Sequence, residues 1–192
     1  MENLTTIIEG CKAKQPMSQR AMYEQYYPYA CKIAFRYIYR YDKAVDVVND
    51  GFVKLFTHFD KFQYAPGQDV QRMLMGWIRK IMVNTAIDSL RSKNMMPEIG
   101  GIPEYVWEEE PTAEVSAEQR LYYKELIILI KELPPSYQVV FNMYVIDGFT
   151  HPEIAQELGI SVGASKSNLA KARAHLRKKL NTDISEIDVC SF

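Results

Sequence analysis

The last helical stretch of the chain carries side chains that can contact nucleic acid. Small residues begin this stretch, and Lys166, Asn168 and Lys171 follow them at helical spacing. Lysine can donate hydrogen bonds to guanine and asparagine can pair with adenine through its amide, whereas Arg173 suits a phosphate group. The candidate DNA-contacting residues are Ser165, Lys166, Ser167, Asn168, Lys171 and Arg173. The plainer interpretation is a solvated basic helix that closes a helical hairpin.

The residues that precede this stretch favour the nucleic-acid interpretation. Thr150 and Glu153 predict a capping box at the start of a short helix. Gly159 suits the left-handed end of that helix, and Ser161 caps a longer one that runs to about Leu180. A short helix, a glycine turn and a longer basic helix form the layout of a helix-turn-helix, whose second helix enters the major groove.

A second candidate nucleic-acid surface lies on the helix predicted for residues 72–93. Trp77, Asn84 and Arg91 share one stripe of this helix because they lie two turns apart. Cations and amides beside aromatic rings suit single-stranded DNA, whose bases stack while its backbone follows positive charge. By periodicity alone Trp77 is a core residue, and Tyr64 in the preceding loop can stack a base or seal the bundle. The candidates here are Tyr64, Trp77, Lys80, Asn84 and Arg91.

The helix before it combines an apolar stripe with an acidic face. The acidic face carries Asp46, Asn49 and Asp50, and it would repel DNA. The apolar stripe includes Phe52, at helical spacing from its apolar neighbours. Two interpretations of the acidic face are open, a solvated helix surface and a docking face for a protein partner.

Helical periodicity places these surfaces in two separate units of an all-α fold. Apolar residues recur at steps of three and four, and no alternating stretch of strand length stands out. We predict an N-terminal helical bundle over residues 18–94 and a C-terminal four-helix domain with the helix-turn-helix over residues 116–181. Between them, residues 95–115 are rich in proline, glycine and acidic residues and have no helical period, which predicts a flexible, self-repelling linker.

Composition and motif content argue against several classes of protein. The chain has 192 residues, a net charge of -1 and 47% apolar residues, as in ordinary globular proteins. It has no apolar run of roughly 20 residues and no secretion signal at its start, so we expect a cytoplasmic protein. Three cysteines and three histidines lie far apart, and no phosphate-binding glycine loop is present. We therefore expect no enzyme activity, metal, cofactor or small-molecule substrate.

Several stretches of the chain, in this order and spacing, are similar to one known family. They resemble the extracytoplasmic-function (ECF) group of bacterial RNA polymerase sigma factors. Residues 44–56 are similar to the polymerase-binding helix of that family's region 2, and residues 77–91 to its promoter-melting helix. Leu133-Pro134 and residues 148–167 resemble region 4. The match covers nearly all of residues 18–180.

The resemblance implies roles for individual residues. Asp46, Asn49, Asp50 and Phe52 fall where the family docks on the largest subunit of the polymerase. Asn84 falls where an asparagine holds a base flipped from the non-template strand of the minus-ten element, and the loop over residues 62–72 would supply the rest of that pocket. Four residues fall on the surface that reads the duplex minus-thirty-five element, namely Lys166, Ser167, Asn168 and Lys171.

The resemblance therefore implies a sigma factor that binds core RNA polymerase, recognises a two-part promoter and starts to melt it without doing chemistry itself. It also implies an anti-sigma partner linked to the membrane. The main alternative is a stand-alone helix-turn-helix regulator that binds duplex operators as a dimer. A second alternative, an enzyme that modifies nucleic acid, is disfavoured because the sequence shows no catalytic site. Gly51 departs from the family pattern, since a mid-helix glycine costs about 1 kcal/mol against alanine and relatives usually carry a larger residue.

Overall fold

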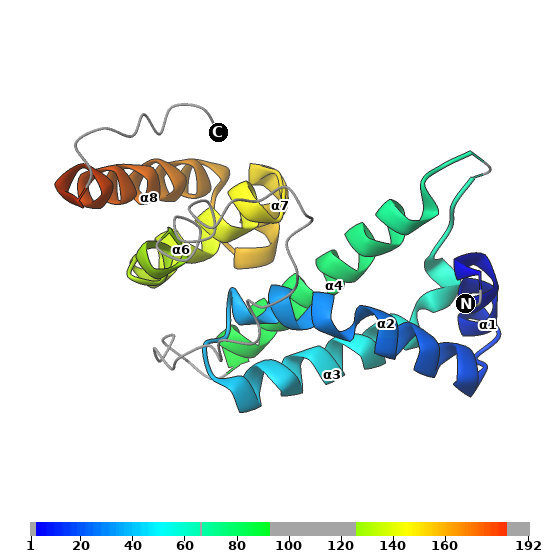
Figure 1. Ribbon diagram of the computed structural model, residues 1–192. Helices are drawn as coiled ribbons and strands as arrows, with labels where there is room; N and C mark the ends of the chain where they lie inside the picture. Colours follow the sequence, from blue (N-terminus) through cyan, green and yellow to red (C-terminus); the bar gives the residue numbers. More distant parts are fainter. Residues whose placement is uncertain (1–2, 66, 93–125, 184–192) are drawn as a thin grey trace. The chain divides into compact units, whose positions relative to one another are not determined.

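The computed structural model describes residues 3–65, 67–92 and 126–183, and the chain divides into two compact units, residues 1–108 and 109–192. Every regular element in these described ranges is helical, which confirms the predicted all-α fold (Figure 1). The predicted linker at residues 95–115 and the start of the predicted C-terminal domain lie outside the described residues. None of the described helices is long and apolar enough to span a membrane.

The first unit begins with a helix, α1 (Leu4–Lys12), that lies ahead of the predicted start of the bundle at residue 18. The side chain of Asn3 caps it by accepting a hydrogen bond from the backbone N–H of Thr5 at 3.3 Å. Helix α1 packs against the next helix along the chain, and its side chains Ile7, Ile8 and Cys11 are buried. Figure 1 shows α1 at the N-terminal end of this unit. Sequence analysis missed α1 because three buried side chains in nine residues give little periodic signal.

Three longer helices form the rest of this unit, α2 (Pro16–Phe35), α3 (Tyr41–Thr57) and α4 (Val70–Ser92), with a short 3₁₀ helix, η1 (Phe59–Lys61), after α3. Each of the three packs against the other two. Each fully buried side chain stabilises the fold by roughly 1.5–3 kcal/mol. The largest fully buried side chains of this core are Met22, Ile33, Phe35, Phe52, Leu55, Phe59, Leu74, Ile78 and Met82.

The packing of α3 against α4 explains why position 51 is a glycine. A Cβ atom at this position would lie 2.4 Å from Sδ of Met82, which is fully buried on α4. The thioether of Met82 thus occupies the space that a side chain on α3 would need. The helix-propensity cost of glycine is offset by the close approach of α3 to α4.

The second unit contains a helical segment at residues 126–131, α6 (Pro135–Phe141), a π-helical turn η3 (Asn142–Ile146), α7 (His151–Leu158) and α8 (Val162–Asp183). Both α6 and α7 pack against α8. The buried side chains between them include Val140, Met143, Ile154, Leu169, Ala172 and Leu176. Gln138 Nε2 donates to the carbonyl of Ile130 at 3.0 Å and ties α6 to the preceding segment.

The capping and turn predictions for the helix-turn-helix are confirmed. Thr150 and Glu153 form both hydrogen bonds of a capping box at the start of α7. Gly159 ends α7 with a left-handed φ of 65°, a conformation that glycine adopts without a Cβ penalty. Ser161 Oγ accepts from the backbone N–H of Ala164 at 3.0 Å and caps α8. Local hydrogen bonds therefore fix where α7 begins and where α8 begins.

The contact between Gly51 and Met82 predicts coupled stability. Met82→Ala should leave a smaller cavity when position 51 already carries the methyl group of Gly51→Ala. We expect Met82→Ala to cost about 1 kcal/mol less in the Gly51→Ala background than in the wild-type chain. Urea denaturation of the two single variants and the double variant measures this difference, and strictly additive costs would contradict the contact.

Candidate nucleic-acid interface

The outer face of α8 presents most of the predicted contact residues together. Lys166, Ser167, Lys171 and Arg173 are exposed, and Asn168 is half-buried beside them. The opposite face of the helix is buried against α6 and α7. A helix held in this way offers one basic, polar surface, of the width that a major groove accepts.

Ser165 does not belong to this surface, which corrects our prediction. Its side chain is 0% exposed, because positions 165, 169 and 172 share the buried face of α8. Its hydroxyl lies 2.9 Å from Nδ1 of His151, the first residue of α7. The small size of Ser165 serves close packing between helices and not close approach to DNA.

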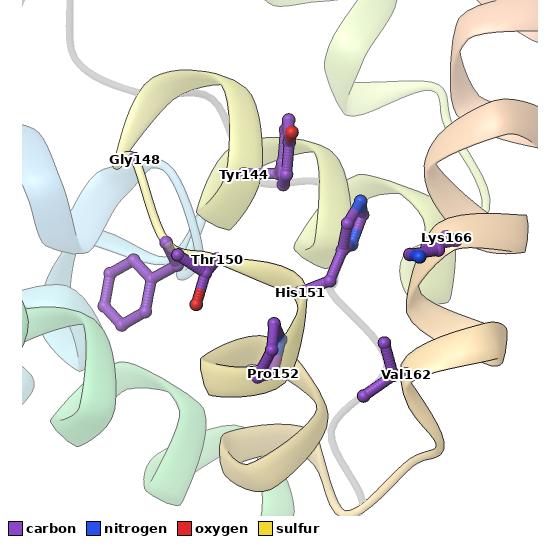
Figure 2. A pocket seen from close by; sticks show the side chains of 8 residues that line it. Tyr144, Gly148, Thr150, His151, Pro152, Val162 and Lys166 are labelled. Carbon is purple, nitrogen blue, oxygen red and sulfur yellow. The ribbon is translucent and has the colours of Figure 1, made fainter.

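An open hollow of about 530 Å³ lies between the start of α7 and α8 (Figure 2). The ring of His151 stands on one side of it, stacked on Tyr144 with ring centroids 4.4 Å apart, and Lys166 stands on the other (Figure 2). Burial lowers the pKa of His151 below its ordinary value, and the cations Lys166 and Arg173 lower that pKa further. The neutral imidazole is therefore favoured near neutral pH.

Lys171 has a neighbour that sequence analysis did not anticipate. Its ammonium lies 5.8 Å from the ring centroid of Tyr137, near the start of α6. A cation–π contact at an exposed site contributes about 0.5–1 kcal/mol. This contact holds one of the candidate contact residues in place before any ligand binds.

In the first unit, Trp77 belongs to an aromatic cluster between η1 and α4. Its ring meets Phe59 edge-on at 5.4 Å and stacks on Phe62 at 5.2 Å between centroids. Trp77 remains partly exposed. The packing that the periodicity indicates is therefore present, but Trp77 is not a fully buried core residue, and its exposed part is available to a ligand.

Tyr64 lies at the edge of the same cluster and contacts α1. Its hydroxyl is 3.4 Å from Oε1 of Glu9, and the ammonium of Lys12 lies 5.2 Å from its ring centroid. Phe62 packs beside it at 5.9 Å between centroids. Tyr64 is thus held from several sides, and the helix that holds it is the one that sequence analysis missed.

The other candidates on α4 line its solvent side. Lys80 and Arg91 are exposed, and Asn84 is partly exposed. Asp88 lies on the same stripe and forms a 3.0 Å ion pair with Lys54 of α3. The ion pair neutralises the carboxylate that would otherwise oppose an anionic ligand on this stripe.

The acidic face of α3 is exposed, as predicted. Asp46, Asn49 and Asp50 are exposed, and Asn49 Oδ1 accepts a hydrogen bond from the hydroxyl of Tyr23 at 3.0 Å. Phe52, which the resemblance placed among the docking residues, is only 2% exposed and packs on the ring of Tyr23 with centroids 4.7 Å apart, so it belongs to the core and not to the exposed face. The apolar stripe that includes Phe52 already indicated this burial.

Val53, next to Phe52 in the chain, is the exposed apolar residue beside the carboxylates of α3. It is 65% exposed and lies two turns from Asp46 and one turn from Asp50 on the same face. The sequence signal for Val53 was its spacing, because it lies three residues after Asp50 and seven after Asp46 and so shares their face of the helix. We define the docking face as Asp46, Asn49, Asp50 and Val53.

Within the described residues, no group of three or more histidine, cysteine or acidic side chains is arranged to hold a metal ion. Cys11 is buried and Cys31 is half-buried, and both are free thiols. Burial raises the pKa of Cys11 to about 11. At neutral pH this thiol stays protonated and is a packing group.

Comparison with known proteins gives matches on both units. The family model for sigma-70 region 2 matches residues 22–95, and the model for sigma-70 region 4 matches residues 123–176. The chain is 26% identical over 158 residues to the ECF RNA polymerase sigma factor SigW of Bacillus subtilis, covering 78% of this chain and 81% of SigW. It is 25% identical over 158 residues to the ECF RNA polymerase sigma factor SigE of Mycolicibacterium smegmatis, covering 81% of this chain and 58% of SigE.

The fold is similar to that of a solved structure. The sigma factor RpoE of Bartonella quintana, in complex with the anti-sigma factor NepR, aligns with a TM-score of 0.53 and 18% sequence identity. The alignment covers 86% of this chain and 98% of that chain. At this identity the likeness concerns the fold alone.

The correction at Phe52 and Val53 generates a stability test. Phe52→Ala empties a packed site and should lower the free energy of unfolding by about 3–5 kcal/mol. Val53→Ala removes an exposed side chain and should change it by no more than about 0.5 kcal/mol. Urea denaturation of the two neighbouring variants measures both values, and similar costs would place Phe52 back on the surface.

Proposed function

The chain belongs to the sigma-70 family of RNA polymerase sigma factors, in its extracytoplasmic-function group, and we propose that its two units divide promoter recognition between them. Such a factor binds core RNA polymerase and directs it to promoters, where transcription starts. The observation that carries this function is the presence of both sigma regions, in order, in one chain. A stand-alone helix-turn-helix regulator does not need region 2, so that alternative is not favoured.

We propose the following division of the chain. Residues 18–94, preceded by α1, act as region 2, and residues 116–181 act as region 4. Residues 95–115 connect them as an acidic tether. The two compact units and the two matched ranges support this division, whose exact boundaries are part of the proposal.

The outer face of α8 would read the duplex minus-thirty-five element. Lys166, Ser167 and Asn168 lie near its N-terminal end, where the second helix of a helix-turn-helix meets base edges. Lys171 and Arg173 follow on the exposed face and would contact phosphates or further bases. The basic charge and exposure of this face support the assignment.

The solvent side of α4 and the adjoining aromatic cluster would bind the opened minus-ten strand. Lys80 and Arg91 supply positive charge for the backbone, and Asn84 supplies an amide for a base edge. Tyr64 and the exposed part of Trp77 would supply aromatic surface for stacking. Taking a base out of the duplex costs a few kcal/mol, which these contacts would offset.

The docking face of α3 would bind core polymerase. Asp46 pairs with Lys43 of the same helix at 3.4 Å, and the carboxylates of this face would complement a basic partner surface, with exposed Val53 as an apolar centre among them. The hydrogen bond from Tyr23 fixes Asn49 in place on this face. Asn49 would therefore lose little side-chain freedom on binding.

We further propose that the chain catalyses no reaction itself, because the polymerase does the chemistry, and that it acts in the cytoplasm, where the polymerase works. We also propose a protein partner that blocks the binding surfaces of this chain. The Bartonella RpoE structure holds the anti-sigma factor NepR, and a comparable anti-sigma factor, membrane-linked in the family pattern, would control this chain.

Transcription in vitro tests the function directly. The purified chain is mixed with sigma-free core polymerase and a library of promoter fragments, and transcripts are mapped by sequencing. We expect transcripts that start at defined sites only when the chain is present. Binding to a duplex operator without polymerase, together with no initiation, would support the regulator alternative.

Lys166 gives a test of the reading face. If its ammonium contacts a base, Lys166→Ala should weaken binding to the selected upstream duplex by about 1–3 kcal/mol and relax the preference at one position. Lys178→Ala, farther along the same helix, is the matched control and should weaken all sequences alike. Binding titrations with selected and scrambled duplexes measure both effects. An unchanged sequence preference in Lys166→Ala would remove Lys166 from the reading face.

Asp50 gives a test of the docking face. Asp50→Arg reverses a charge on an exposed position, so the thermal unfolding midpoint should hardly change while binding to core polymerase falls at least about tenfold. Asp60→Arg, an exposed acid on η1 outside the docking face, is the control. Co-purification with core polymerase measures the difference, and equal recovery of both variants would refute the assignment.

A further inference from the structure

The core of the helix-turn-helix contains a hydroxyl group that is completely buried. Ser165 is 0% exposed and shares the inner face of α8 with Leu169 and Ala172. A hydroxyl in such a site costs free energy unless it has a hydrogen-bond partner. Its partner is Nδ1 of His151, at 2.9 Å, on the neighbouring helix α7.

His151 joins three elements of the second unit, since it belongs to one and contacts two others. It is the first residue of α7, it stacks on Tyr144 of η3 with a ring centroid distance of 4.4 Å, and it meets Ser165 of α8. Figure 2 shows the imidazole standing between Tyr144 and the first turns of α8. The stack on Tyr144 holds the plane of the imidazole ring, and the hydrogen bond turns its Nδ1 toward the hydroxyl of Ser165.

The position of this hydrogen bond on α8 matters for recognition. Ser165 directly precedes Lys166 and Ser167, so a movement of its backbone carries these two residues with it. Recognition groups must be held within about 0.5 Å of their productive geometry. A restraint on the first turns of α8 therefore acts on the residues nearest to the base edges.

We propose that His151 is a positioning residue for DNA recognition, which sets the first turns of α8 through its hydrogen bond to buried Ser165. The proposal deepens the function proposed above and rests on it. It assigns His151 no contact with DNA. The residue acts through Ser165 on Lys166 and Ser167.

The side-chain chemistry of histidine supplies matched variants. Asparagine carries its amide at the distance from the backbone where histidine carries Nδ1, whereas glutamine reaches the place of Nε2. His151→Asn should keep a partner for Ser165, and His151→Gln and His151→Ala should remove it. Ser165→Ala removes the other half of the pair. All four variants are made in the full chain, and thermal unfolding checks that each is folded.

Binding is measured on a duplex that the wild-type chain selects from a randomised pool and on a scrambled duplex. His151→Ala and His151→Gln should lose about twofold to tenfold in affinity for the selected duplex only, as expected for one net hydrogen bond. His151→Asn should restore wild-type affinity. Adding Ser165→Ala to His151→Ala should cause no further loss, because both remove the same interaction. The salt dependence should not change, since no phosphate contact is lost.

Four outcomes of the binding measurements would overturn the proposal. The first is an equal loss of affinity for both duplexes, and the second is a salt dependence whose slope falls by about one, which would make His151 itself a phosphate ligand. The third is additive losses of affinity in the double variant. The fourth is no recovery of affinity in His151→Asn. Nitrogen NMR of the His151 side chain without DNA tests the contact separately. Its Nδ1 signal should shift in Ser165→Ala, and an unchanged signal would also overturn the proposal. The selection and the titrations are run with the chain bound to core polymerase. If this complex selects no duplex, the proposed function fails, while the NMR result still reports on the contact between His151 and Ser165.

Discussion

Each helix that we assign to binding must bury one face to be folded and can offer only the opposite face to a partner. The helical repeat of 3.6 residues decides which side chain falls on which face. On α3 this constraint sends Phe52 inward and Val53 outward, although the two are neighbours in the chain. On α8 it sends Ser165 inward and Lys166 outward. The binding surfaces that we propose consist of the side chains left exposed once the opposite face of each helix is buried in the core.

Much of the fold could be predicted because it depends on local signals. The capping box at Thr150, the left-handed glycine at position 159 and the cap at Ser161 are each determined within a few residues of chain, and each was correctly predicted. The existence of the helices followed from apolar residues repeating at helical spacing. Local chemistry of this kind is readable in a single sequence.

The errors have physical causes that a single sequence hides. Ser165 was misplaced because a small polar residue fits both a DNA-facing position and a buried one, and only its partner His151, fourteen residues away, decides between them. The contacts of Tyr64 with Glu9 and Lys12 join segments more than fifty residues apart, and no local sequence pattern predicts them. Residue roles that depend on distant partners cannot be read from spacing alone.

The fit between Gly51 and Met82 links two helices that we assign to different tasks, docking on α3 and strand binding on α4. A lineage that enlarges position 51 first would meet a filled site, and one that shrinks position 82 first would pass through a chain with a void. Evolutionary change at one helix is therefore contingent on change at the other. The order in which such substitutions arise, and not only their identity, would then decide which descendants of this protein survive.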